Sequence, residues 1–364
     1  MGLPELYFSY QTAAQTAVSR SKQGIVALLL QDAGLTAGVY TVAHEADIPT
    51  ELGEDNREHV RRAMVGYVNQ PAKIYLSVVG AAGTVADAME QVSRLNFDYV
   101  AGWPDLDATE AEALAKDVIT RRKKNFIGKA VVPGYAADDV GVINVVAEDI
   151  KTAAGAQNGI TLKAGTCTAA QYCARVAGLL AGTPAEGSAT GAALGEVESV
   201  KAMTDTELDT AIEAGKFVLY DDGRKIRVAR AVNSSTTSAA GSILRKIKAA
   251  EIIDLIHYYA VTTADDEYRG QCANTYDNKC LLVAAVQGYL TSLEPELLSE
   301  GTGKAEIDVD AVRAWLKEQG TAVEDMTEDE IRKADTGSYV FIALSGYIVD
   351  AMEDFSISLA LSNA

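Results

Sequence analysis

The stretch Gly24-Ile25-Val26-Ala27-Leu28-Leu29-Leu30 decides the fold class of this chain. It is short, apolar and bounded by polar residues, which is typical of a strand buried on both faces of a parallel sheet. Further strands and helices are predicted to alternate after it: strands at 73–79, 97–101, 126–132 and 142–146, and helices at 84–95 and 108–122. This alternation favours an α/β class, with a layered core and a largely parallel sheet.

The middle of the chain contains one well-marked helix and one hairpin signal. Thr168 can cap a helix that runs to Ala181, and Gly182-Thr183-Pro184 ends it. The stretch from Pro184 to Gly195 is rich in Gly, Ala and Ser, and we expect a mobile or contact-making loop there. The turn Asp221-Asp222-Gly223-Arg224 separates two apolar runs, 217–220 and 226–232, and predicts a β-hairpin.

The polar stretch Asn233–Ser242 predicts a domain boundary, because helical patterns dominate beyond it. Apolar stripes at helical spacing include Ile252, Ile256 and Tyr259, and a helix is predicted at Val309–Glu318. We therefore expect an α/β core domain (23–235) and a helix-rich α+β C-terminal domain (236–349). An N-terminal arm (1–22) and a C-terminal arm strand (350–364) would flank them, with strand-like segments at 339–349 and 355–361.

Composition and charge narrow the classes of partner. The 364 residues include 51 acidic and 32 basic side chains, a net charge of −19. This balance disfavours nucleic acid and anionic membranes as partners, because phosphate contacts need clustered Lys and Arg. The longest apolar run, Ile25–Leu30, is far too short to cross a bilayer. The four cysteines form no C-x-x-C pair and there are three histidines, so we expect no metal site and reduced thiols in a cytoplasm.

Signatures of chemistry are absent from the sequence. It lacks a dinucleotide fingerprint, a G-x-S-x-G elbow and an H-E-x-x-H motif, and Gly182–Ser188 lacks the lysine of a P-loop. We therefore predict no catalytic residue and no cofactor. His44 and His59 are expected in an exposed acidic region, and His257 packed in a helix.

One polar cluster leaves an enzymatic alternative open. An unrecognised active site of an α/β enzyme is conceivable at 274–279, between Cys272 and Cys280. We favour a structural motif in which Asp277 or Asn278 caps the next helix. The members of the cluster are Asn274, Tyr276, Asp277, Asn278 and Lys279.

Both ends of the chain alternate like strands. Phe355-Ser356-Ile357-Ser358-Leu359-Ala360-Leu361-Ser362 places its large apolar residues on one face of an extended segment. The N-terminus carries a shorter match with Leu6, Phe8 and Tyr10. Each segment could pair inside its own chain, or it could add to the sheet of a neighbouring copy.

Six segments taken in order resemble the tail sheath proteins of contractile phage tails and phage-tail-like bacteriocins. The likeness is closest to the compact sheaths of Gram-positive prophages. Stretches near 153–166 and 184–195 look longer here than in that family, which affects the expected surface loops. The segments span nearly the whole chain: 21–27, 175–184, 226–234, 274–282, 335–338 and 350–354.

The resemblance implies a function as well as a fold. Members of the family form hexameric rings stacked helically around a tail tube, and their terminal arms insert into the sheets of neighbouring subunits. Contraction drives the tube through the target envelope without ATP. The implied partners are copies of the chain itself, the tail tube protein, and baseplate and tail terminator proteins, with no nucleic acid and no membrane insertion.

The resemblance also assigns residues and a location. Leu3–Tyr10 would form the N-terminal arm and Phe355–Leu361 the C-terminal arm strand, while the C-terminal domain would face the tube. The implied location is a virion tail or a phage-tail-like particle assembled in the host bacterial cytoplasm. The expected subunit contacts are Leu3, Leu6, Phe8, Tyr10, Phe355, Ile357, Leu359 and Leu361.

Overall fold

The computed structural model describes residues 24–236, 242–356 and 358, and these fall into two compact units. One unit, here called the α/β unit, contains the described residues up to Glu251 together with those from Ala351 onward. The other, here called the inserted unit, is Ile252–Asp350. The division lies within helix α7 (Ile247–Thr263), beyond the boundary expected at 235/236.

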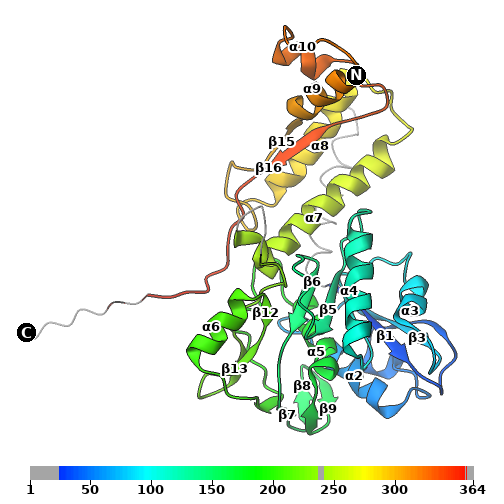
Figure 1. Cartoon of the computed structure of the whole chain (residues 1–364), viewed down its shortest axis with the longest axis vertical. Helices are drawn as coiled ribbons and strands as arrows, with labels where there is room; N and C mark the ends of the chain where they lie inside the picture. Colours follow the sequence, from blue (N-terminus) through cyan, green and yellow to red (C-terminus); the bar gives the residue numbers. More distant parts are fainter. Residues whose placement is uncertain (1–23, 237–241, 357, 359–364) are drawn as a thin grey trace, which may run out of the picture. The chain divides into compact units, whose positions relative to one another are not determined.

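A seven-stranded sheet forms the centre of the α/β unit (Figure 1). The strand order is β12-β6-β5-β4-β1-β3-β2. All neighbouring strands are parallel except β2, which runs antiparallel to β3 at one edge. The predicted α/β class is confirmed, and the opening stretch forms an interior strand, β1, between β4 and β3. The bounds are β1 (Ile25–Gln31), β2 (Gly38–Val42), β3 (Lys73–Val79), β4 (Tyr99–Ala101), β5 (Lys129–Pro133), β6 (Val142–Val145) and β12 (Lys216–Phe217).

Alternate residues of β1 belong to two different hydrophobic cores. Val26, Leu28 and Leu30 pack with helices α2 (Glu54–Met64) and α5 (Ala169–Ala181). Ala27 and Leu29 pack with α3 (Val85–Gln91) and α4 (Ala108–Arg122). Side chains of a strand point alternately to opposite faces, and helices cover both faces of this sheet. The residues of β1 from Ile25 to Leu30 are therefore all apolar.

The segments around the sheet contain more regular structure than the sequence indicates. The stretch near 153–166 forms the hairpin β8 (Gly155–Gln157)–β9 (Ile160–Leu162) and the start of β10 (Gly165–Cys167). β10 joins β7 (Ile150–Thr152) and β11 (Val197–Ser199) in a small antiparallel sheet. The predicted hairpin forms from β13 (Leu219–Asp221) and β14 (Ile226–Val228), after α6 (Asp205–Glu213). Among the described residues, 3₁₀ turns occur at Glu45–Asp47 and Ser242–Arg245.

The inserted unit is helix-rich and carries one two-stranded sheet. α7 ends in a π-helical turn (Ala264–Tyr268), and α8 (Tyr276–Ser292), α9 (Val309–Glu318) and α10 (Glu328–Lys333) follow. β15 (Lys304–Ile307) pairs antiparallel with β16 (Ile342–Ser345).

The strand expected at 339–349 is shorter than predicted. Its remainder is held by irregular bonds, as where Ser299 N donates to Tyr347 O and Val349 N to Leu297 O. In the part of the chain that the structure describes, no helix combines the length and hydropathy needed to cross a bilayer.

Candidate functional site

The six segments that carry the resemblance contact one another in the fold. The first of these contacts lies at the end of helix α5. Gly24 N donates to Ala181 O at 2.8 Å. A Cβ atom on Gly24 would lie 2.9 Å from Ala181 Cα, and one on Gly178 would lie 1.9 Å from Ala63 O. Segments 21–27 and 175–184 therefore need these glycines, because α5 approaches the sheet and α2 at backbone distance.

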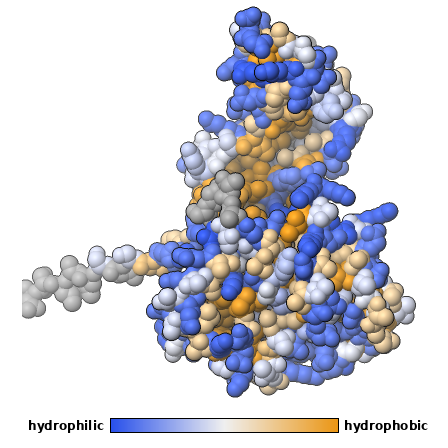
Figure 2. Space-filling model, viewed as in Figure 1, coloured by the Kyte–Doolittle hydropathy of each residue, from blue (hydrophilic) through white to orange (hydrophobic). Residues whose placement is uncertain are grey.

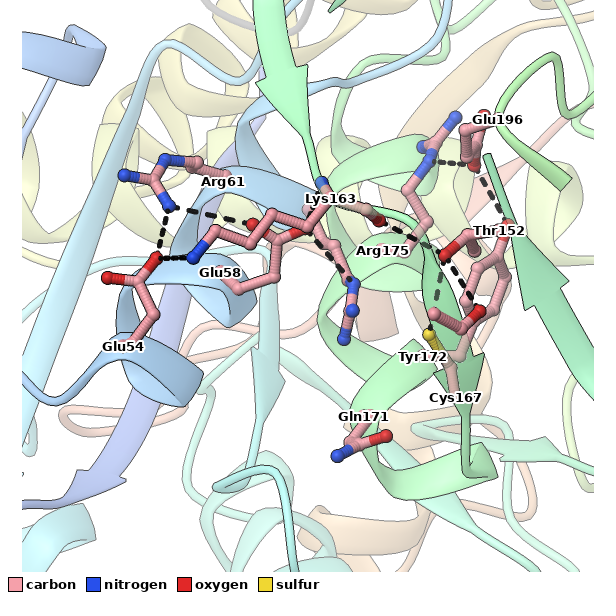
Figure 3. Close-up of polar contacts among 12 residues, drawn as sticks. Glu54, Glu58, Arg61, Thr152, Lys163, Cys167, Gln171, Tyr172, Arg175 and Glu196 are labelled. Atoms are coloured by element: carbon pink, nitrogen blue, oxygen red, sulfur yellow. Dashed lines mark hydrogen bonds and ion pairs between the residues drawn. The ribbon is translucent and has the colours of Figure 1, made fainter. Parts of the chain in front are cut away.

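A buried ion pair also fixes helix α5 (Figure 3). Arg175 Nε donates to Glu196 Oε1 at 2.6 Å, and both side chains are at most 3% exposed. The Tyr172 hydroxyl donates to the same carboxylate at 2.9 Å, and Arg175 Nη1 donates to Gly66 O at 2.7 Å. Burial alone raises the pKa of Glu196, but Arg175 outweighs it and the pKa lies below its usual range. The pair therefore stays charged.

The charged residues beside this pair join α2 to the β8–β9 hairpin (Figure 3). Glu54 accepts hydrogen bonds from Lys163 Nζ at 2.5 Å and from Arg61 Nη1 at 3.2 Å, and these lower its pKa to about 2. Glu58 Oε1 accepts from Lys163 N at 3.0 Å. This group of titratable side chains is therefore occupied in holding two elements together.

His59 is fully buried, so the expectation of an exposed position was wrong. Its Nε2 lies 2.9 Å from Gly102 O, and burial lowers its pKa to about 4. Of its acidic neighbours in sequence, Glu54 and Asp55 are not buried, whereas Glu58 is buried as His59 is. The helical turn, and not the acidity of the segment, therefore decides that His59 points inward.

The polar segment 274–279 meets segment 335–338 in a second cluster, here called the Lys279 cluster (Asn274, Lys279 and Thr336). Lys279 Nζ donates to Thr336 Oγ1 at 2.9 Å and to Ala334 O at 3.3 Å. Asn274 Nδ2 donates to Gly337 O at 2.7 Å, and Thr336 Oγ1 donates to Tyr339 O at 2.6 Å. The cluster therefore fixes the turn that leads into β16.

The other predicted members of this motif lie around the start of α8. Thr275 is the N-cap, and its hydroxyl accepts from Asn278 N at 3.3 Å. The prediction that Asp277 or Asn278 caps the helix was wrong, because both lie inside the first turn. Asn278 Nδ2 reaches back to Ala273 O at 2.8 Å, and the Tyr276 ring lies 5.7 Å from Lys333 Nζ.

The contacts of Lys279 do not favour the active-site alternative. Its side chain is buried, and the loss of solvent lowers its pKa, with Asp335 acting in the opposite sense. Its ammonium group nevertheless donates to a carbonyl and a hydroxyl of its own chain, which is the geometry of a structural cation. The described residues include no group of three His, Cys, Asp or Glu side chains that could hold a metal ion.

A third meeting point joins segment 350–354 to segment 226–234 and to the Gly-rich loop. Glu353 Oε1 accepts from Ser188 Oγ at 2.7 Å, and its Oε2 lies 3.1 Å from Lys246 Nζ. Arg230 contacts two acids, with Nη1 3.3 Å from Glu353 Oε2 and Nη2 2.7 Å from Asp354 Oδ1. We call these five residues the Glu353 clasp.

The two acidic side chains of the clasp differ in how far they are exposed to solvent. The Glu353 side chain is 5% exposed, whereas that of Asp354 is 77% exposed. Burial raises the pKa of Glu353, but hydrogen bonds from Ser188, Thr190 and Lys246 outweigh it, so the pKa lies below its usual range. Glu353 is therefore held as a buried carboxylate among cations.

Sequence reasoning did not find the clasp, although Arg230 and Glu353 lie in the segments that carry the resemblance. The predicted arm residues remain predictions. Phe355 is 74% exposed and outside any strand. The rest lie outside the described residues: Leu3, Leu6, Phe8, Tyr10, Ile357, Leu359 and Leu361.

Comparisons with known proteins agree with the resemblance. The family model for the phage tail sheath protein central domain matches residues 79–234. The tail sheath protein of Clostridium phage phiCD119 is 33% identical over 99% of both chains. The crystal structure of the sheath tail protein Lin1278 from Listeria innocua has a TM-score of 0.64 at 14% identity, covering 95% of this chain and 99% of its own.

A solved assembly shares the fold. The chain of the anti-feeding prophage helical sheath in the contracted state has a TM-score of 0.66 at 13% identity, with 94% of each chain covered. At this identity the likeness shows the fold alone. The match to the Clostridium phage sheath protein over its whole length shows more: this chain belongs to the phage tail sheath protein family.

Proposed function

We propose that this structural subunit of a contractile tail polymerises with its own copies into stacked hexameric rings around a tail tube. Contraction of the polymer would drive the tube through the target cell envelope. Its other partners would be the tube protein and the baseplate and terminator proteins, and assembly would take place in the bacterial cytoplasm before the virion or tail-like particle is complete. The role needs no enzymatic activity and no cofactor.

The full-length relationship to a phage tail sheath protein is the observation that carries this proposal. The contracted helical sheath of the anti-feeding prophage adds support, since a chain with this fold forms a polymer there. Within this chain, the polar clusters are occupied by contacts that hold elements together, as expected of a structural protein.

The exposed surface of the inserted unit supports exchange of strands between copies. Within the described residues, β15 and β16 pair with each other and with no third strand. Gln287 of α8 accepts from Ala305 N at 2.8 Å on the outer edge of β15, so the edge available to a further strand is that of β16. Exposed apolar side chains occur in β16 at Leu344 and next to β16 at Tyr339 and Tyr347. Figure 2 shows apolar surface along this unit. Unpaired edges next to apolar side chains favour addition of a further strand, and residues 355–361 of another copy have the alternation to supply it.

Electron microscopy of the purified protein tests the proposal directly. The full-length chain should form long striated tubes, and a chain lacking residues 355–364 should stay monomeric. Normal tubes from the truncated chain would show that the C-terminal arm is not needed.

Matched substitutions make the same test finer. Ile357→Lys places a charge on the apolar face of the alternating segment and should prevent assembly. Ser358→Lys places the same charge on the opposite face and should leave assembly intact. Equal effects of the two changes would contradict the assignment of a strand with one buried face.

A further inference from the structure

The Glu353 clasp lies where the chain enters and leaves the inserted unit. Lys246 directly precedes α7, whose course carries the chain out of the α/β unit after Glu251. Glu353 follows shortly after the chain returns at Ala351. The ion pair between Lys246 and Glu353, 3.1 Å long, therefore joins the outgoing and returning segments.

The cations of the clasp are held on a rigid support. Residues 230–233 run beside residues 245–247, with Ile247 N donating to Ala231 O at 3.0 Å and Asn233 N to Arg245 O at 2.9 Å. Arg230 and Lys246 thus come from two neighbouring backbone segments. Ala231 N also donates to Thr190 Oγ1 at 3.0 Å, which fixes the loop that supplies Ser188. The Gly-rich loop expected to be mobile or contact-making is, at this point, held in place and supplies Ser188 to the clasp.

The returning segment has no regular structure of its own. Residues 351–356 form neither helix nor strand. Met352 and Phe355 are largely exposed, whereas the carboxylate of Glu353 is buried. Glu353 and Asp354 both attach this short segment to the α/β unit, and Glu353 does so through a buried carboxylate.

We propose that the Glu353 clasp closes the inserted unit into a loop and anchors the base of the C-terminal arm to the α/β unit. This inference rests on the proposed function for the arm itself. A force applied to residues beyond Phe355 is then transmitted through Glu353 to Arg230 and Lys246 of the α/β unit. It is not transmitted through β16 and the helices of the inserted unit. Arg230 and Lys246 act as positioning residues for the arm.

Proteolysis of the monomer tests the clasp without any need for polymerisation. Chymotrypsin can cut after Met352 and after Phe355, and cleavage after Met352 requires the clasped segment to detach. Glu353→Gln keeps the shape and removes the charge, so the rate of cleavage after Met352 should rise about tenfold or more relative to cleavage after Phe355. The control Asp354→Asn removes an exposed acid on the same guanidinium and should change this ratio by less than about threefold.

A double-mutant cycle guards against a general loss of structure. Lys246→Met should raise the cleavage ratio, and adding Glu353→Gln to it should raise the ratio by less than the product of the two single effects. Circular dichroism should show unchanged helix content in all variants. Cleavage after Met352 at the wild-type rate in Glu353→Gln would overturn the clasp.

Polymers then test the mechanical role. Tubes of Glu353→Gln should form but come apart at a lower urea concentration than wild-type or Asp354→Asn tubes, because each arm keeps its strand pairing and loses its anchor. Equal resistance of all three would refute a load-carrying clasp. Failure of the wild-type chain to form tubes would instead contradict the proposed function, while the proteolysis result on monomers would still decide whether the clasp exists.

Discussion

Replacing Arg175 by Met should destabilise the α/β unit strongly. The guanidinium neutralises Glu196 at 2.6 Å and also satisfies Gly66 O at 2.7 Å. Met replaces the aliphatic stem of the side chain without the guanidinium, so the variant leaves a buried carboxylate with the Tyr172 hydroxyl and no cation. Removing one partner of a buried ion pair costs about 3–5 kcal/mol.

Urea unfolding followed by circular dichroism measures this loss. With an m value of about 3 kcal/mol per molar, the expected penalty lowers the midpoint of the α/β unit by about 1–1.7 M. The matched control is Lys201→Met, because Lys201 and Glu148 form a pair of nearly the same length, 2.5 Å, with both side chains more than half exposed. Water screens that pair, so its loss should leave the midpoint unchanged.

The pH dependence provides a second signature of the same mechanism. In Arg175→Met the unpaired Glu196 should have a raised pKa and bind a proton in the folded state. The destabilisation of Arg175→Met relative to the wild type should therefore grow as the pH rises from 4 through the raised pKa of Glu196, and it should shrink in acid. A penalty equal to that of the exposed control, or one independent of pH, would refute the account of Arg175 and Glu196 as a buried charged pair.

Three further changes test other parts of the fold. Gly178→Ala should lower the free energy of unfolding, measured in urea, by about 1–3 kcal/mol, because the new Cβ would meet Ala63 O. The control Gly288→Ala lies at an open helical position and should be neutral or stabilising. Equal effects of the two changes would contradict the close approach of α5 and α2. The folded-state pKa of His59, about 4, lies below its unfolded value of about 6.5, so about 3 kcal/mol of stability should be lost as the pH falls from 6.5 to 4. His59→Gln should flatten that slope, and an unchanged slope would point to other groups. Lys279→Met should lower the free energy of unfolding of the inserted unit, measured by thermal unfolding, by about 2 kcal/mol, because two hydrogen bonds are lost. An unchanged stability would favour the alternative of an active site at 274–279.

The elements predicted best from the sequence are those whose residues are buried on all sides. Strand β1 is apolar from Ile25 to Leu30, and the helix after Thr168 has a cap and a clear stop, so local patterns are sufficient. Strand β2 was missed because its burial alternates weakly at an edge of the sheet. The hairpin β8–β9 was missed because its short strands contain Gly and small residues, and contacts with α2 stabilise it.

The Glu353 clasp could not be predicted because its members are far apart in sequence. Glu353 meets Ser188, Arg230 and Lys246 through the path of the chain, and no spacing rule links these positions. Histidine 59 illustrates the same difficulty on a smaller scale. Charged neighbours in sequence indicate that a residue is exposed. In a helix, however, successive side chains point in different directions around the axis, and this decides which of them is buried.

The placement of the inserted unit has a consequence for how such chains can diverge. Every strand of the seven-stranded sheet is complete by Phe217, and the two hydrophobic cores on its faces draw on residues no later than Ile247. Residues 252–350 can therefore lengthen, shorten or be exchanged without interrupting a strand or removing a core residue from the sheet. A chain built in this way can change the surface of the inserted unit while keeping the scaffold that carries it, so chimeras joined at 251 and 351 would test whether this unit sets specificity between sheaths, as the proposed function predicts.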